Sequence, residues 1–469
     1  MRLIGFSLAV LLLLMLVLGA CFLFWPVQST KEIFAGNTYM PYSSEKSVFG
    51  NADTQQHLKA PVDSQLNRLK TTHTIEQNYQ PSQVNTADIR LIEGRFLLNT
   101  RLPNQKLALD NFFEAITNQS DTAHVHVAFY GDSQIEGDRV TSDMRGILAS
   151  TWPTQQAIGF VPIIERSINV SVNKTLGGNW LKYSFFDKKH PKKRYGASGM
   201  TFKFSPPSAS IKLKFHRMKH KGYHLSYGKT TKPLIVNVYD VESWKRIASD
   251  TLKPDSVANA NFHRTNWSEP VQKVKFEFIS QASTEVFGLY LYSSGNGIQI
   301  DNYGLLGHSG YGFLSANASF MASQHRALNT RLIILQFGAN AMPYINSPKE
   351  YDFMRKEFGK TIQKIKEICP QASILILGPG EMARRVGGSY KSYGNAQKFA
   401  NLLKGLAQAH GAAFFDLHQL MGGTPNLSAW QRKKWVYADG HLTEKGHYAL
   451  AKALSDALLQ EWSVYQQAN

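Results

Sequence analysis

Four near-continuous apolar runs constrain the fold of this chain more than any other feature. They occupy residues 125–130, 332–337, 373–377 and 412–415. Segments with helical periodicity, at 351–368, 396–410 and 443–460, separate or follow them. Strands without polar alternation are buried on both faces, and helices between them are the usual cover. The sequence therefore predicts an α/β domain built on a parallel sheet, over 104–154 and 301–469.

Residues 155–300 follow a different pattern. Short runs there alternate apolar and polar residues, at 201–205, 211–216, 234–239, 274–279 and 286–292. In one of them Ile211, Leu213 and Phe215 would face inward, whereas Lys212 and Lys214 would face water. Alternation with period two and turn residues between the runs is typical of antiparallel sheets. We expect an all-β sandwich inserted into the α/β domain.

The first 27 residues read as a membrane signal. No charged residue occurs from Leu3 to Trp25, and Arg2 precedes this stretch. At about 1.5 Å per residue, it is long enough to cross a hydrocarbon core of roughly 30 Å. An N-terminal transmembrane anchor is expected; a lipoprotein attached at Cys21 and a cleaved signal peptide are the alternatives. All three place the remainder outside the cytoplasm, and the polar residues 28–103 then read as a linker.

Charge and cysteine content exclude several classes of function. The net charge is +18, but no zinc finger, RNA-binding signature or basic helix accompanies it, so nucleic acid is not expected as a partner. The two cysteines, Cys21 and Cys369, have no metal-ligand spacing and are not expected to pair.

The first apolar run ends in the pentapeptide Tyr130-Gly-Asp-Ser-Gln134. Ser133 therefore follows the carboxyl end of a predicted parallel strand, where α/β proteins place their active sites. A nucleophilic serine also needs a base, a group that orients the base, and donors for the oxyanion. A Gly-Asp-Ser tripeptide alone is more often a turn.

Three later blocks supply those groups in order, carrying Gly307, Asn340 and His441. Gly307 lies in a glycine-rich turn, Asn340 follows the run 332–337, and His441 precedes the last helical segment. With Ser133, this set resembles the SGNH hydrolases, also called the GDSL family, whose four blocks supply Ser, Gly, Asn and His. The resemblance implies a flavodoxin-like α/β domain.

The resemblance also implies a role for each residue. Ser133 would attack an acyl carbon, and His441 would accept and return its proton. The backbone N–H groups of Ser133 and Gly307 and the side-chain amide of Asn340 would bind the oxyanion. One such donor typically contributes about 2.7–4 kcal/mol of transition-state stabilisation.

The acid departs from the family pattern. Family members carry it three residues before the histidine, where this chain has Ala438; here Asp439 lies two residues before His441. We predict that Asp439 orients His441. The alternative is a Ser-His dyad whose histidine is held by a backbone carbonyl.

The inserted β-sandwich and the string from Gly131 to Arg139 further resemble exported peptidoglycan O-acetylesterases. We therefore expect a serine esterase that removes O-acetyl groups from a cell-envelope glycan through an acyl-Ser133 intermediate. No metal or organic cofactor is expected. The protein would be tethered to the inner membrane and face the periplasm or cell exterior. A glycan O-acetyltransferase with the same residues, and a non-catalytic glycan-binding protein, remain alternatives.

Overall fold

The computed structural model describes residues 96–119, 124–165, 167–216, 218–253, 260–293, 297–423 and 427–469. The predicted anchor at 1–27, Cys21, and the linker up to residue 95 lie outside these residues. Within them, no helix combines the length and the apolar character that crossing a membrane requires.

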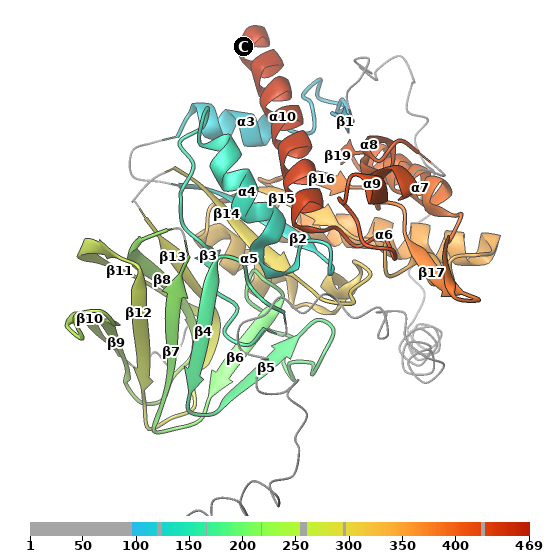
Figure 1. The fold of residues 1–469 in the computed structure, drawn as a ribbon. Coiled ribbons are helices and arrows are strands. Elements are labelled where there is room, and N and C mark those ends of the chain that lie inside the picture. Colours follow the sequence, from blue (N-terminus) through green and yellow to red (C-terminus); the bar gives the residue numbers. More distant parts are fainter. Residues whose placement is uncertain are drawn as a thin grey trace, which may run out of the picture. The chain divides into compact units, whose positions relative to one another are not determined.

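The central sheet has six strands in the order β1-β19-β16-β15-β2-β14 (Figure 1). Their bounds are Leu97–Leu98 (β1), His124–Gly131 (β2), Gly297–Gly304 (β14), Thr330–Gln336 (β15), Ser373–Leu377 (β16) and Ala413–Phe415 (β19). Only β1 is antiparallel to its neighbour; the other pairings are parallel. Numbered along the chain, the parallel strands have the order 2-1-3-4-5, which is the flavodoxin-like topology. The predicted fold class of this part is confirmed.

Helices cover both faces of the sheet (Figure 1). One face is covered by α3 (Asp110–Thr117), α4 (Arg139–Leu148) and α10 (Glu444–Ala468), and the other by α5 (Ala318–Ala327), α6 (Pro348–Ile368) and α7 (Ala396–Ala409). The remaining elements are short: α8 (Leu417–Leu420), α9 (Leu427–Arg432), η2 (Glu136–Asp138), η3 (Gly312–Ser315), η4 (Met342–Tyr344), and a hairpin of β17 (Ala383–Val386) and β18 (Ser389–Ser392). Burial on two sides explains why the strands lack polar alternation.

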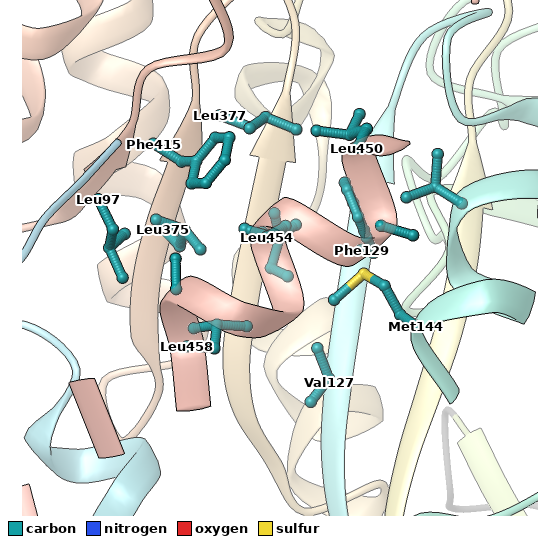
Figure 2. Packing of buried hydrophobic residues seen from close by; sticks show 14 of the residues in the cluster. Leu97, Val127, Phe129, Met144, Leu375, Leu377, Phe415, Leu450, Leu454 and Leu458 are labelled. Atoms are coloured by element: carbon teal, nitrogen blue, oxygen red, sulfur yellow. The ribbon is translucent and has the colours of Figure 1, made fainter. Parts of the chain in front are cut away.

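The C-terminal helix α10 is fixed by its apolar stripe. Leu450, Leu454 and Leu458 recur every four residues, are at most 1% exposed, and pack against Val127, Leu375 and other residues of the sheet (Figure 2). Burying one such side chain contributes about 1.5–3 kcal/mol. Thr443 caps the helix by accepting the N–H of Gly446 at 3.2 Å. The loop just before α10 is therefore held at the carboxyl edge of the sheet.

The segment between α4 and β14 forms two antiparallel sheets. The first has the order β10-β9-β12-β7-β4 and the second the order β11-β8-β13-β6-β5, with β3 paired to β13. Their bounds are Gly159–Phe160 (β3), Val172–Gly177 (β4), Trp180–Ser184 (β5), Met200–Phe204 (β6), Ser208–Phe215 (β7), His220–Gly228 (β8), Leu234–Asp240 (β9), Arg246–Leu252 (β10), Ala260–Val271 (β11), Lys273–Ile279 (β12) and Glu285–Tyr292 (β13). No helix occurs among the described residues of 155–300.

Aromatic contacts join these two sheets into a sandwich. Tyr223 of β8 meets Phe276 of β12 edge-on at 5.3 Å, and Trp180 of β5 meets Phe278 of β12 at 5.6 Å. In β7, the alternation is as expected: Ile211, Leu213 and Phe215 are fully buried, and the lysines between them are exposed. The period-two pattern thus identified the inward face correctly.

Two expected boundaries need correction. Residues 96–103 do not belong to the linker, because β1 pairs with β19 and buries both Leu97 and Leu98 against the α/β core. The insert ends before residue 297 and not at 300, because β14 pairs in parallel with β2 over its whole length. Neither boundary is marked by a change in composition, because β1 has only two residues and β14 directly follows the sandwich.

Candidate active site

Ser133 lies at the carboxyl end of the central strand β2. Gly131, the last residue of β2, is in register with Gly304 of β14 and Gln336 of β15. The turn that carries Ser133 is tied to both neighbours, because Gly131 O accepts the N–H of Leu305 at 2.7 Å and Gln336 O accepts the N–H of Asp132 at 3.3 Å. The loops after β14 and β15 therefore flank the serine.

The structure brings Ser133, His441 and Asp439 together across about 300 residues of sequence. Ser133 Oγ is 3.0 Å from His441 Nε2, and His441 Nδ1 is 3.0 Å from Asp439 Oδ2. All three residues are 7–8% exposed. If Nδ1 carries the proton that faces Asp439, Nε2 is an acceptor directed at the serine hydroxyl. This is the arrangement of a nucleophile, a base and a group that orients the base.

Gly440 explains how an acid only two residues before the histidine reaches it. Its φ is +94°, and a Cβ at this position would lie 2.5 Å from the carbonyl oxygen of Glu381. The resulting turn lets Asp439 Oδ1 accept the backbone N–H of His441 at 3.0 Å, while Oδ2 faces the ring. Burial alone would raise the pKa of Asp439, but its bonds to the His441 ring and backbone outweigh burial, so the pKa lies below its usual value.

Asp132 has a different environment from Asp439, although the two lie near the same site. It is fully buried, and its Oδ1 accepts the N–H of Gln134 at 3.0 Å. Its Oδ2 has no hydrogen-bond partner among the described residues. Burial raises the pKa of Asp132 to about 7. The carboxyl group next to the serine is therefore protonated in mildly acidic solution.

Gln134 connects the serine turn to the histidine loop, and the sequence alone assigned it no role. Its side chain is 5% exposed. Its Oε1 accepts the N–H of Leu442 at 3.1 Å, and its Nε2 donates to Gly440 O at 3.5 Å and contacts Met382 Sδ at 3.3 Å. These bonds hold the backbone on both sides of His441. A glutamine beside a motif gives no indication that it is buried, so only the structure identifies this contact.

Of the three expected oxyanion donors, Gly307 and Asn340 lie in the loops that flank Ser133. Gly307 follows β14 and has a φ of +73°, a conformation that L side chains rarely adopt. Asn340 follows β15, and its Nδ2 donates to the carbonyl of His308 at 3.3 Å, which joins the two loops. An amide nitrogen carries a second N–H that such a site can use. The roles of Gly307 and Asn340 in binding an oxyanion stay predictions.

Other reactive groups do not compete for the same chemistry. His308 is 3% exposed, and burial lowers its pKa to about 3, so its ring is neutral; its Nδ1 accepts the N–H of Gly310. Cys369 is buried and its pKa is raised to about 12, which keeps the thiol protonated. The described part of the chain contains no group of three or more His, Cys, Asp or Glu side chains able to hold a metal ion.

Comparison with known proteins relates part of the chain to a family. Residues 288–449 match the model of the GDSL-like lipase/acylhydrolase family. The matched segment contains Gly307, Asn340, Asp439 and His441, whereas Ser133 lies before the insert and outside it. No curated protein sequence matches the chain.

Solved structures extend the comparison to the insert. A peptidoglycan O-acetylesterase structure superposes with a TM-score of 0.61 and 16% identity, covering 79% of this chain and 99% of that one. A family two carbohydrate esterase from Cellvibrio japonicus (TM-score 0.25, 11% identity, 62% and 99% coverage) and a family 6 carbohydrate-binding module (TM-score 0.20, 12% identity, 29% and 95% coverage) also match, but at scores too low to establish a shared fold.

The parallel sheet and the serine, histidine and aspartate at its edge define a serine-type hydrolase built on an α/β domain. The site and the match over residues 288–449 identify the chain as a carboxylic ester hydrolase with a segment similar to the GDSL-like, or SGNH, family, and its fold resembles that of a peptidoglycan O-acetylesterase.

Proposed function

We propose that this esterase removes O-acetyl groups from a glycan of the cell envelope, with peptidoglycan as the preferred substrate and Ser133 as the nucleophile. The observation that carries the proposal is the continuous contact from Ser133 Oγ to His441 Nε2, and from His441 Nδ1 to Asp439, each at 3.0 Å. The name of the O-acetylesterase that shares this fold supports the substrate class.

The reaction proceeds in two acyl-transfer steps. Ser133 Oγ attacks the acetyl carbon while His441 Nε2 takes its proton; the tetrahedral intermediate then expels the sugar oxygen, which receives that proton from His441. The products of this step are the free sugar hydroxyl and acetyl-Ser133. Water then attacks the acetyl carbon with His441 again as base, which releases acetate and restores Ser133. Asp439 stays ionised and stabilises the imidazolium formed in each step.

Charge develops on the acetyl oxygen in both steps. The proposed donors to this oxygen are the N–H groups of Ser133 and Gly307 and the Asn340 amide, which come from the ends of three adjacent parallel strands. Donors fixed by the backbone need no reorganisation when charge appears, which is the main source of stabilisation in acyl transfer. Glycine at 307 leaves room for the substrate beside its backbone.

The proposal includes export and membrane tethering through residues 1–27, so that the enzyme would meet an envelope glycan. The support for it is the uncharged stretch Leu3 to Trp25 after Arg2. Fractionation of cells that express the full chain should recover it with membranes, and a protease added outside the cytoplasmic membrane should digest it. Recovery in the cytoplasm would contradict this part of the proposal.

The activity is tested by acetate release from O-acetylated peptidoglycan fragments. The purified full-length chain should release acetate, and Ser133→Ala should reduce the rate by at least about 1,000-fold. Equal rates for the two proteins would contradict the proposed nucleophile. If acetate appears on an added oligosaccharide acceptor and not in solution, the enzyme is a transferase and the hydrolytic conclusion fails.

A further inference from the structure

One turn of the inserted sandwich reaches the Gly307 loop. The turn follows β5 and carries Phe186, whose side chain is 43% exposed. A Cβ built on Gly307 would lie 3.6 Å from the Phe186 ring, and the ring meets that of His308 edge-on at 6.4 Å. An exposed aromatic ring from the insert thus lies beside the loop that is expected to bind the oxyanion.

The turn is fixed in place by its neighbours. Ser184 Oγ accepts the N–H groups of Phe186 at 3.3 Å and Asp187 at 2.9 Å. The neighbouring Phe185 is 1% exposed and packs against Phe313, with ring centroids 5.0 Å apart. Phe313 belongs to η3 of the α/β part. A ring that stays exposed on such a rigid turn is preorganised for a ligand, since binding costs little conformational entropy.

A cleft beside Phe186 joins the insert to the loops of the active site. From the insert it is lined by Phe186, Lys182 and Asp187, and from the α/β part by Glu136, which is three residues after Ser133, and by the segment 304–306. Lys182 Nζ lies 3.8 Å from the Asp187 carboxylate. The cleft therefore combines one apolar face with charged groups that can donate and accept hydrogen bonds.

We propose that this cleft is the subsite for the sugar ring that carries the ester, with Phe186 as its stacking platform and Lys182 and Asp187 as hydrogen-bonding partners of its polar substituents. A pyranose ring has an apolar C–H face and a polar rim, which fits an exposed ring flanked by charged side chains. The Phe186 ring lies beside Gly307, so a sugar stacked on it would be next to the loop that is expected to bind the acetyl oxygen. The inference rests on the proposed function, because it requires a glycan ester as substrate.

The test compares a large and a small ester on the same variants of the full-length protein. Ethyl acetate has no ring to stack, whereas an O-acetylated glycan fragment occupies the subsite. For Phe186→Ala, kcat/KM with the glycan should fall by about 10-fold or more, mainly through KM, and kcat/KM with ethyl acetate should change by less than about two-fold. Phe186→Trp should retain the glycan activity.

Trp244 provides the matched control. It is also an exposed aromatic residue of the insert, 61% exposed and located between β9 and β10, and it does not line the cleft. Trp244→Ala should leave both substrates unaffected. An equal loss with both esters for Phe186→Ala would show that Phe186 only supports the Gly307 loop, and no loss with the glycan would also overturn the subsite.

The two proposals fail in different ways. If the wild-type protein hydrolyses ethyl acetate but no O-acetylated glycan, the proposed substrate is wrong and the sugar subsite is excluded with it. If the wild type hydrolyses the glycan and Phe186→Ala does so equally well, the proposed function stands and only the subsite is wrong.

Discussion

The parallel sheet and the inserted sandwich place their polar groups in different positions. Along β2, β15 and β16 almost every residue is buried, and the reactive groups lie beyond the carboxyl ends, where Ser133 and Asn340 follow their strands. In the sandwich, polar residues alternate outward along strands such as β7, and the turn at Phe186 reaches the active-site loops. Two covered faces leave only an edge for chemistry, whereas the sandwich can contribute recognition through a single turn.

The largest expected effect is on catalysis at the edge of the parallel sheet. Asp439→Asn keeps the shape of the side chain but removes the charge that faces His441 Nδ1. We expect kcat to fall by about 100- to 10,000-fold on both a glycan ester and ethyl acetate, because the imidazolium loses its partner. A change below about three-fold would favour the Ser-His dyad, in which Asp439 only caps the turn. Asp416→Asn, at the N-cap of α8, is the control and should leave kcat unchanged.

A second prediction compares how one carboxyl group in the α/β part and one in the sandwich make the free energy of unfolding depend on pH. Burial raises the pKa of Asp132 to about 7, so the folded protein holds a proton that the unfolded chain releases above about pH 4. This contribution to the free energy of unfolding is fully present below about pH 4 and is lost as pH rises to about 7, by roughly 4 kcal/mol at most. In urea unfolding, the free energy of unfolding of Asp132→Asn should therefore rise relative to that of wild type as the pH increases from about 4.5 to about 8.

Asp240, the last residue of β9 in the sandwich, is the control with the opposite sign. A hydrogen bond from Ser243 Oγ lowers the pKa of this exposed carboxylate. Its small stabilising contribution is present above the unfolded pKa and is lost only as the solution becomes more acidic than that value. Asp240→Asn should therefore differ from wild type by a small loss of stability that stays constant with pH over the range where Asp132→Asn gains. Identical behaviour of the two variants would contradict the buried, protonated state of Asp132.

A smaller effect is expected from the contact that joins the serine turn to the histidine loop. Gln134→Ala removes the acceptor of the Leu442 N–H and should lower kcat by about 10-fold, with little change in KM, because His441 is held less firmly. The loss should be equal for ethyl acetate and the glycan, in contrast to Phe186→Ala. Gln397→Ala, on the exposed face of α7, should have no effect. A rise in KM for the glycan alone would mean that Gln134 binds substrate.

The sequence predicted the parts of the molecule that depend on local pattern. Apolar runs identified four of the five parallel strands, and alternation identified the inward face of β7. The strand β14 was missed because Gln299, Asp301 and Asn302 interrupt its apolar residues; they are nevertheless buried, and Asp301 Oδ2 bonds to His126 Nε2 at 3.0 Å. A polar network between elements far apart in sequence leaves no periodic trace.

The candidate site shows the same limit. The order of the blocks predicted which residues meet, and the contacts of Ser133, His441 and Asp439 follow that prediction. The sequence could not decide whether Asp439 reaches His441, because the backbone turn at Gly440 depends on packing against Glu381 and Met382. Phe186 gave no signal at all, since its position beside Gly307 arises only when the insert folds against the α/β part.

The most direct test of the central claim is covalent labelling of the nucleophile. A fluorophosphonate reacts irreversibly with an activated serine, and peptide mapping by mass spectrometry locates the adduct. The account predicts one adduct per chain, on Ser133, that forms at the rate at which ester hydrolysis is lost and is absent in Ser133→Ala. An inactivated enzyme labelled on another residue, or a hydrolytically active enzyme in which Ser133 stays unlabelled, would contradict it.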